Sequence, residues 1–330
     1  MTHRAPRPLL LVLLVALAAV GLVACGDDAD DGGGNATTST SGGASPGAKI
    51  VENDANGKVR ITIGSKNFTE QKVLGEIYAE ALDAAGYEVD KQLNLGDEQT
   101  ALKTLEQGQI DAYPEYTGTA LLSFFDVKTE DLPKEPAAAF EQVKADFAKK
   151  DLVALPPTPF TSSNEVAVTK ATADRYGLRT ISDLSKVASR LTLYGSPECR
   201  QRLDCLLGLQ RTYGLRFKRF VPVDLSQRSK VLSGGQADVS IVFTTDPQNK
   251  RDGFVLLQDD KGMFPPYNST LVVRKATYDQ AGPDLARTIA AVNAKLTADV
   301  VQELNARVDL DKETPEEAAE DYLKQFGFTD

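Results

Sequence analysis

From residue 59 onward, the apolar positions alternate between the period of a strand and the period of a helix. Val59–Ile63 alternates apolar and polar side chains, which predicts a half-buried strand. A helix is expected from Thr69 to Gly86, because apolar residues recur at helical spacing and glycine ends the run. The pattern continues with a strand, a helix and a strand at 87–95, 98–107 and 110–113. This βαβαβ order predicts a mostly parallel sheet covered by helices.

The same order of elements recurs further along the chain, with strands and helices expected between residues 182 and 243. Leu105–Asp111 and Leu232–Asp238 also share the pattern L-x-x-G-Q-x-D, and an aromatic residue, Tyr116 or Phe243, follows five residues after each aspartate. Ordinary junctions of a helix, a glycine and a strand would produce the same match. A genuine repeat would mean two similar lobes with an aromatic wall each, because ligands bind beyond the carboxyl ends of parallel strands.

The first 24 residues have the pattern of an export signal. Arg4 and Arg7 precede an apolar run of about 15 residues, which is too short for a comfortable membrane span. Ala24 and Cys25 resemble the lipobox of bacterial lipoproteins, which predicts that Cys25 is lipidated; an ordinary signal peptide with an incidental cysteine is the alternative. Residues 25–57 are rich in small and polar residues, so we expect a disordered tether that leaves the folded part at the outer face of the membrane.

Composition narrows the classes of function. The chain has 37 Lys and Arg against 47 Asp and Glu, a net charge of −10, and loses Arg4 and Arg7 with the signal, which disfavours nucleic acid or anionic lipid as the main partner. The single histidine is His3, so the mature chain has no histidine for a nucleophile pair or a metal site, and we expect no cofactor or metal. Outside the cytoplasm, Cys199 and Cys205 are expected to form a disulfide.

Several short motifs follow one another along the folded part. They are Gly64–Gln71 (GSKNFTEQ), Tyr113–Thr119 (YPEYTGT), the loop of Pro197–Leu206, Thr244–Asp246, Asp259–Gly262 and Pro265–Tyr267. Together they resemble the substrate-binding lipoproteins of osmoprotectant ABC importers, a family that binds glycine betaine, proline betaine, choline or carnitine. The resemblance implies the α/β, type II periplasmic-binding-protein fold, with a ligand cleft between two lobes. Lobe 1 would comprise residues 58–161 and 266–330, and lobe 2 residues 162–265.

The resemblance also implies a ligand site. A quaternary ammonium holds its charge on methyl groups and is bound best by the faces of several aromatic rings. A ligand carboxylate is bound by lysine, arginine or hydroxyl groups. The family's carboxylate positions correspond to Lys66, Thr119 and Arg202, and its cage positions to Tyr116, Asn164, Phe243 and Tyr267. Two of these depart from an all-tyrosine cage, because Phe243 lacks the hydroxyl and Asn164 has no ring, while Ser162 stands where relatives can have an acidic residue.

The hypothesis is a non-catalytic, lipid-anchored and monomeric receptor that hands a small zwitterionic or quaternary-ammonium solute to a membrane permease. The sequence has no G-x-x-x-x-G-K-[ST] phosphate loop, so the ATPase is expected on another subunit. We further expect the disulfide to position Arg202 toward the cleft. The departures from the cage leave open another zwitterion, such as an amino acid or ectoine. Two different classes of function also stay open, an extracellular hydrolase with paired carboxylates and a receptor that signals or adheres.

Overall fold

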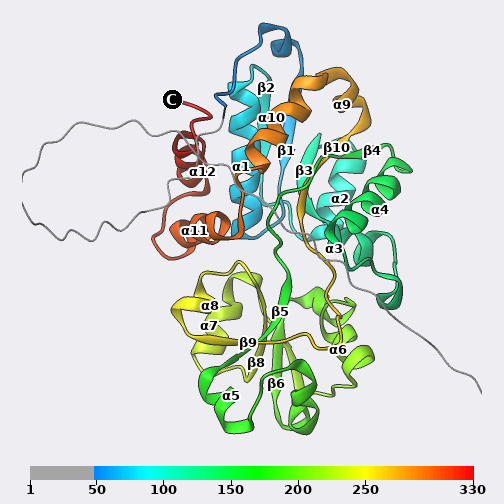
Figure 1. The fold of residues 1–330 in the computed structure, drawn as a ribbon, viewed down its shortest axis with the longest axis vertical. Coiled ribbons are helices and arrows are strands. Elements are labelled where there is room, and N and C mark those ends of the chain that lie inside the picture. Colours follow the sequence, from blue (N-terminus) through cyan, green and yellow to red (C-terminus); the bar gives the residue numbers. More distant parts are fainter. Residues whose placement is uncertain (1–47) are drawn as a thin grey trace, which may run out of the picture. The chain divides into compact units, whose positions relative to one another are not determined.

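The computed structural model describes residues 48–330, so the predicted signal peptide, Cys25 and most of the predicted tether lie outside the described residues. The described part contains two five-stranded sheets, each with its own helices (Figure 1). We call the two halves built on these sheets lobe 1 and lobe 2. Within residues 48–330, no helix combines the length and the apolar character that crossing a membrane requires.

Lobe 1 is built on a sheet with the strand order β2-β1-β3-β10-β4. Its strands are β1 (Arg60–Gly64), β2 (Glu88–Gln92), β3 (Ala112–Tyr116), β4 (Leu152–Ala154) and β10 (Ser269–Arg274). β1 pairs in parallel with β2 and β3, whereas β10 runs antiparallel to both β3 and β4. Every residue of β3 is buried, as expected for a central strand that is covered on both faces.

Helices cover both faces of this sheet. Successive side chains of a strand point to opposite faces, so neighbouring residues of one strand join different apolar clusters. On β10, Leu271 and Val273 belong to one apolar cluster and Val272 belongs to another. The first cluster contains α1 (Thr69–Ala84), α10 (Pro283–Asn293), α11 (Ala298–Asp309) and α12 (Pro315–Gln325), which pack together around α1. The second contains α2 (Glu98–Glu106) and α4 (Pro136–Ala148); the short α3 (Thr117–Thr119) follows β3, and α9 (Lys275–Ala281) follows β10.

Lobe 2 repeats this plan with the strand order β7-β6-β8-β5-β9. Its strands are β5 (Asn164–Thr169), β6 (Thr192–Gly195), β7 (Arg219–Pro222), β8 (Val239–Phe243) and β9 (Phe254–Leu257). Its helices are short: α5 (Lys170–Tyr176), α6 (Leu206–Tyr213), α7 (Arg228–Ser233) and α8 (Gln248–Arg251), with a 3-10 helix at Ile181–Lys186. The side chains of Val166 and Val168 join one apolar cluster and that of Ala167 another, so this sheet is also covered on both faces.

The chain passes twice between the lobes. Residues 155–163 connect β4 of lobe 1 to β5 of lobe 2, and residues 258–268 connect β9 of lobe 2 to β10 of lobe 1. The two crossing segments pair with each other by an antiparallel bridge between Thr161 and Asn268. The backbone N–H of Ser162 donates to the carbonyl of Tyr267 at 3.0 Å. This pairing holds Ser162 and Tyr267, two residues of the predicted site region, beside each other.

The two-lobed α/β class is confirmed, but the sheets are mixed rather than mostly parallel. β5 and β10 are the strands that enter each sheet directly from a crossing segment, and each runs antiparallel to both of its neighbours. The remaining pairs, β1 with β2 and β3 and β6 with β7 and β8, are parallel. The βαβαβ pattern in the sequence identified only these parallel strands.

The folded part begins before Lys58, whereas the sequence predicted a disordered tether up to residue 57. The backbone N–H of Ile50 donates to the carbonyl of Phe328 at 2.9 Å, and the Ile50 side chain packs against the core of lobe 1. Asn56 is buried in a 3-10 turn, Asp54–Lys58, and its amide donates to the carbonyl of Ala85 at 2.8 Å. These contacts to lobe 1 order a segment whose own composition is too polar to predict folding.

Candidate functional site

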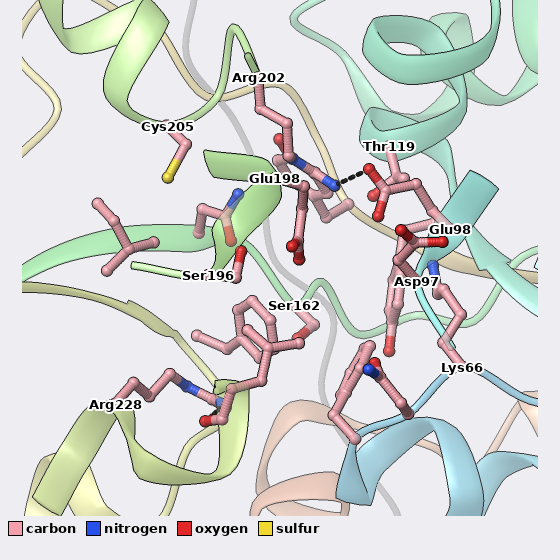
Figure 2. Close-up of a pocket in the computed structure, with 18 residues that line it drawn as sticks. Lys66, Asp97, Glu98, Thr119, Ser162, Ser196, Glu198, Arg202, Cys205 and Arg228 are labelled. Atoms are coloured by element: carbon pink, nitrogen blue, oxygen red, sulfur yellow. Dashed lines mark hydrogen bonds and ion pairs between the residues drawn. The ribbon is translucent and has the colours of Figure 1, made fainter. Parts of the chain in front are cut away.

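A pocket with a cavity volume of about 60 Å³ lies where the two lobes meet. It is lined by all seven residues that the sequence proposed for ligand binding, namely Lys66, Tyr116, Thr119, Asn164, Arg202, Phe243 and Tyr267. Figure 2 shows side chains from both lobes converging on this space. The fold therefore gathers these residues from five strands or their following loops and from one crossing segment.

Lys66 follows β1 and forms a buried ion pair with Glu115 of β3, in which the two side chains are 5% and 0% exposed. Glu115 also accepts hydrogen bonds from the hydroxyl of Tyr113 at 3.0 Å and from the backbone N–H of Tyr116 at 2.7 Å. The Lys66 ammonium lies 4.7 Å from the centre of the Tyr116 ring, within the range of a cation–π contact. Lys66 thus reaches the pocket with its charge already compensated by Glu115.

Tyr116 ends β3, and its hydroxyl donates to the Glu70 carboxylate at 2.6 Å. Glu70 lies in the first turn of α1 and also accepts hydrogen bonds from Asn305 of α11, at 3.0 Å, and from the Thr245 hydroxyl. Burial raises the pKa of the Glu70 carboxyl above its ordinary value, although these hydrogen bonds oppose the shift. Because Thr245 belongs to lobe 2 and the other three residues to lobe 1, this cluster joins the lobes beside the pocket.

Tyr267, from the second crossing segment, packs its ring on Gly118. A Cβ atom at Gly118 would lie 2.6 Å from that ring, so the close approach requires glycine. The Tyr267 hydroxyl donates to Asp204 at 2.5 Å, and the Asn164 amide donates to the same oxygen at 2.9 Å. Burial and the nearby Asp204 charge raise the pKa of Tyr267 well above its ordinary value. Thr119 follows Gly118 and lines the pocket.

Arg202 lies within a loop that is closed by the disulfide between Cys199 and Cys205, whose Cα atoms are 5.1 Å apart. Its guanidinium binds Asp204 through two hydrogen bonds of 2.8 and 2.5 Å. A third hydrogen bond, of 2.7 Å, binds Glu98 of α2 (Figure 2). Burial opposes ionisation of Asp204, but the Arg202 charge and its hydrogen bonds lower the pKa of Asp204 below its ordinary value. The bond to Glu98 also links lobe 2 to lobe 1.

The aromatic wall of the pocket includes Phe243, at the end of β8, and a ring that the sequence analysis did not propose, Phe68. The centre of the Phe68 ring lies 5.2 Å from that of Phe243 and 6.3 Å from that of Tyr116. The Arg228 guanidinium stacks on Phe243, 4.3 Å from the ring centre. The Nε of Arg228 also donates a hydrogen bond to Asp246 at 2.8 Å. One ring of lobe 2 and two rings of lobe 1 thus form a continuous surface.

Sequence reasoning missed Phe68, Glu98, Glu198 and Arg228, which line the pocket, and Asp204, which lies behind it. Phe68 lies in the GSKNFTEQ motif, two residues after Lys66, so its place in this motif could have identified it as a candidate site residue. The charged residues had no such signal, because an isolated acidic or basic residue in a loop or short helix is typical of a solvated surface. Only the folded chain brings them together.

A metal site would need a cluster of ligating side chains. Among the described residues, three carboxylates lie close enough to share an ion, those of Glu76, Glu80 and Glu316. The Lys91 ammonium already bonds Glu76 at 2.7 Å and Glu316 at 2.8 Å, and none of the three lines the pocket. The pocket itself offers aromatic faces, hydroxyl groups and paired charges, which suit binding a small charged solute.

Two α/β lobes, joined by two crossing segments and meeting at a pocket of aromatic and charged residues, define a solute-binding protein of the periplasmic type. Residues 59–325 match the family described as the substrate binding domain of the ABC-type glycine betaine transport system, and the chain belongs to this family. It is thus the extracytoplasmic solute-binding component of an ABC importer.

Known proteins of this kind resemble the chain over most of its length. It is 33% identical over 281 residues to a glycine-betaine-binding protein of Pseudomonas aeruginosa, covering 82% of this chain and 89% of that protein. It is 27% identical over 280 residues to an ergothioneine transport permease/ergothioneine binding protein of Helicobacter pylori, covering 84% of this chain and 50% of that protein. The crystal structure of a glycine betaine/carnitine/choline ABC transporter superposes with a TM-score of 0.65 at 26% identity, covering 81% of this chain and 99% of that one.

Proposed function

We propose that the pocket binds a small quaternary-ammonium solute, such as glycine betaine, proline betaine, carnitine or choline. The observation that supports this most is the aromatic wall, in which rings from both lobes and a crossing segment line one cavity beside paired charges. A quaternary ammonium has no N–H to donate, so ring faces are the surface that it binds best. Closing two lobes around the solute would present a loaded receptor to the permease.

The proposed orientation follows from the chemistry of the walls. In a ligand that carries a carboxylate, that group would face Lys66, Thr119 and Arg202, which supply charge and a hydroxyl. The methylated cation would lie against the rings of Tyr116 and Phe243 and beside the remaining aromatic residues. Each of these side chains would then contact one end of a solute only a few bonds long.

A different zwitterion is the second candidate, and Asn164 is the observation that favours it. Asn164 stands at a position of the family's aromatic cage but offers an amide, and that amide is engaged with Asp204. A wall with fewer rings suits a solute with a polar or planar group beside its charge. An amino acid or ectoine has such groups.

The cellular setting of the protein is also a proposal. The export pattern of residues 1–24 and the cysteine at position 25 support a lipid-anchored protein at the outer face of the cell membrane. We also propose that the protein is a monomer, that its partner is a membrane permease, and that the chain itself catalyses no reaction. A carboxylate-based hydrolase would instead release product from a bound solute, and turnover of any ligand found by calorimetry would favour that function.

Ligand screening tests the proposed function directly. Residues 26–330 would be titrated by calorimetry and by thermal shift with choline, glycine betaine, carnitine, ergothioneine, ectoine and the amino acids. A solute present at about 100 times its dissociation constant should add about 2.7 kcal/mol to the free energy of unfolding. We expect binding of at least one quaternary amine. Binding of amino acids or ectoine alone would replace the first candidate by the second.

A matched pair of variants would then test the aromatic wall. Phe243→Leu removes a half-buried ring while keeping an apolar side chain, and should weaken a quaternary amine by about 1–2 kcal/mol, the value of a desolvated cation–π contact. Phe243→Tyr keeps the ring face and should bind within about threefold of the wild type. Equal affinities of the two variants would show that the ring does not contact the cation.

A further inference from the structure

The positive charges of the pocket are all neutralised before any ligand binds. Three cationic side chains line it, those of Lys66, Arg202 and Arg228. Each is bonded to a carboxylate, Lys66 to Glu115, Arg202 to Asp204 and Arg228 to Asp246. These carboxylates are nearly or fully buried, so water screens the pairs little. None of the three cations therefore presents an unopposed charge to a solute.

Three further carboxylates line the same pocket, those of Asp97, Glu98 and Glu198. Asp97 caps α2 by accepting the backbone N–H of Thr100 at 2.8 Å, and Glu98 shares Arg202 with Asp204. Each group is counted here at its usual charge. The three cations of the lining are balanced by their three buried partners, so the three further carboxylates leave a formal excess of three negative charges. The pocket is therefore complementary to a net positive ligand rather than to a neutral zwitterion.

Glu198 differs from the other carboxylates of the pocket because its side chain has no hydrogen-bond or ion-pair partner among the described residues. It lies on the 3-10 turn Pro197–Arg200, directly before Cys199, so the disulfide anchors the chain next to it, beside the closed loop that carries Arg202. In Figure 2 the Glu198 side chain points into the space between Arg202 and Ser162. Within residues 48–330, Glu198 is thus a half-buried, unpaired carboxylate that lines the pocket.

We propose that Glu198 determines the specificity of the site by attracting a net cation, so that a choline-like solute without a carboxylate binds in preference to a betaine. This inference rests on the proposed function and narrows its substrate class. A solute carboxylate would compete with Glu98 for Arg202 and with Glu115 for Lys66, and Glu198 would repel it. A cation against the rings meets no such competition and gains the attraction of Glu198.

The test compares choline and glycine betaine, which share the trimethylammonium group and differ in the carboxylate. Dissociation constants would be measured by calorimetry with residues 26–330 of the wild type and of Glu198→Gln, which keeps the size and removes the charge. Glu130→Gln is the matched control, because Glu130 is an exposed residue of lobe 1 that does not line the pocket. Glu198→Asp keeps the charge and tests whether charge or shape matters.

We expect wild type and Glu130→Gln to bind choline more tightly than glycine betaine. Glu198→Gln should weaken choline about tenfold and betaine less than about threefold, because attraction of the ammonium and repulsion of the carboxylate nearly cancel in a zwitterion. Glu198→Asp should keep most of the wild-type preference. Equal losses for both solutes in Glu198→Gln, or a wild type that prefers betaine, would overturn the inference while leaving the proposed function standing. A wild type that binds neither solute would overturn both.

Discussion

Lys66 and Glu115 form a buried ion pair at the edge of the pocket, and removing one partner would leave the other charge without compensation. Lys66→Met keeps most of the length and apolar volume of the side chain and removes its charge. Glu115→Gln keeps the shape: its amide oxygen can accept the backbone N–H of Tyr116, and its NH2 group, on the side of Tyr113, donates to that hydroxyl instead of accepting from it. The double variant removes both charges together. It therefore separates the destabilisation caused by an unpaired buried charge from the net contribution of the ion pair to stability.

The expected magnitude follows from burial. The side chains are 5% and 0% exposed, and breaking a buried ion pair from one side typically costs about 3–5 kcal/mol. In Lys66→Met, Glu115 still accepts hydrogen bonds from the Tyr113 hydroxyl and the Tyr116 backbone. We therefore expect the free energy of unfolding to fall by about 3 kcal/mol, near the lower end of this range. Glu115→Gln should cost a similar amount, because the Tyr116 ring compensates the Lys66 charge only in part. The double variant should lose less than either single variant, because no unpaired charge remains.

Urea unfolding of the wild type and the three variants measures these differences as shifts of the midpoint at constant slope. Losses that add, giving about 6 kcal/mol in the double variant, would show that Lys66 and Glu115 contribute independently and would refute the reasoning. The double variant also gives a clean binding test, because its fold is the least disturbed. It should lose affinity for glycine betaine more than for choline if Lys66 contacts a ligand carboxylate.

Three further predictions concern the fold around the site. Burial raises the pKa of Glu165 to about 7 from an ordinary value of 4.5. The stability that Glu165 contributes is therefore fully present below about pH 4.5 and is lost as the pH rises through 7. In urea unfolding at pH 5 and pH 8, Glu165→Gln should reduce the loss of stability between the two pH values by up to about 3 kcal/mol, and an unchanged pH profile would contradict the assignment. Replacing Cys199 and Cys205 by serine should cost about 2 kcal/mol in thermal unfolding, the loop-entropy value for so short a ring, and should weaken ligands that contact the loop; no change after reduction would argue against it. Gly118→Ala places a methyl group 2.6 Å from the Tyr267 ring and should cost about 1–3 kcal/mol and lower ligand affinity, whereas wild-type behaviour in both assays would mean that the ring moves freely.

The parallel halves of both sheets were predictable because each strand there is followed by a helix with a clear period. β1, α1 and β2 lie within a few residues of the predicted ranges, and β6, α6 and β8 lie inside the span 182–243 in which strands and helices were expected. β5 and β10 were not predicted, because each follows an irregular crossing segment and is buried on both faces, so its sequence shows no alternation. Whether such a strand runs with or against its neighbours depends on contacts far away in the sequence.

The candidate site was predictable only where it follows short motifs. Lys66, Tyr116 and Tyr267 stand in motifs that could be compared with a family, and the fold places them on one pocket. Glu98 and Asp204 could not be found in this way, because their role is to bind Arg202 from two different elements. The sequence shows which charges exist but not which of them neutralise one another, and that balance decides the ligand that a pocket prefers.

The contacts that join the lobes also belong to the site that is proposed to hold the solute. Arg202 binds Glu98 across the lobes, Tyr267 of a crossing segment binds Asp204 of lobe 2, and Thr245 of lobe 2 binds the buried Glu70 carboxylate of lobe 1. Each of these polar contacts exchanges with water when the lobes separate, so its net contribution to closure is small compared with its strength in isolation. A solute can shift the balance toward closure only through the difference between its affinities for the two states. Contacts with both lobes at once supply that difference, and a solute held by one lobe alone would bind without closing the protein.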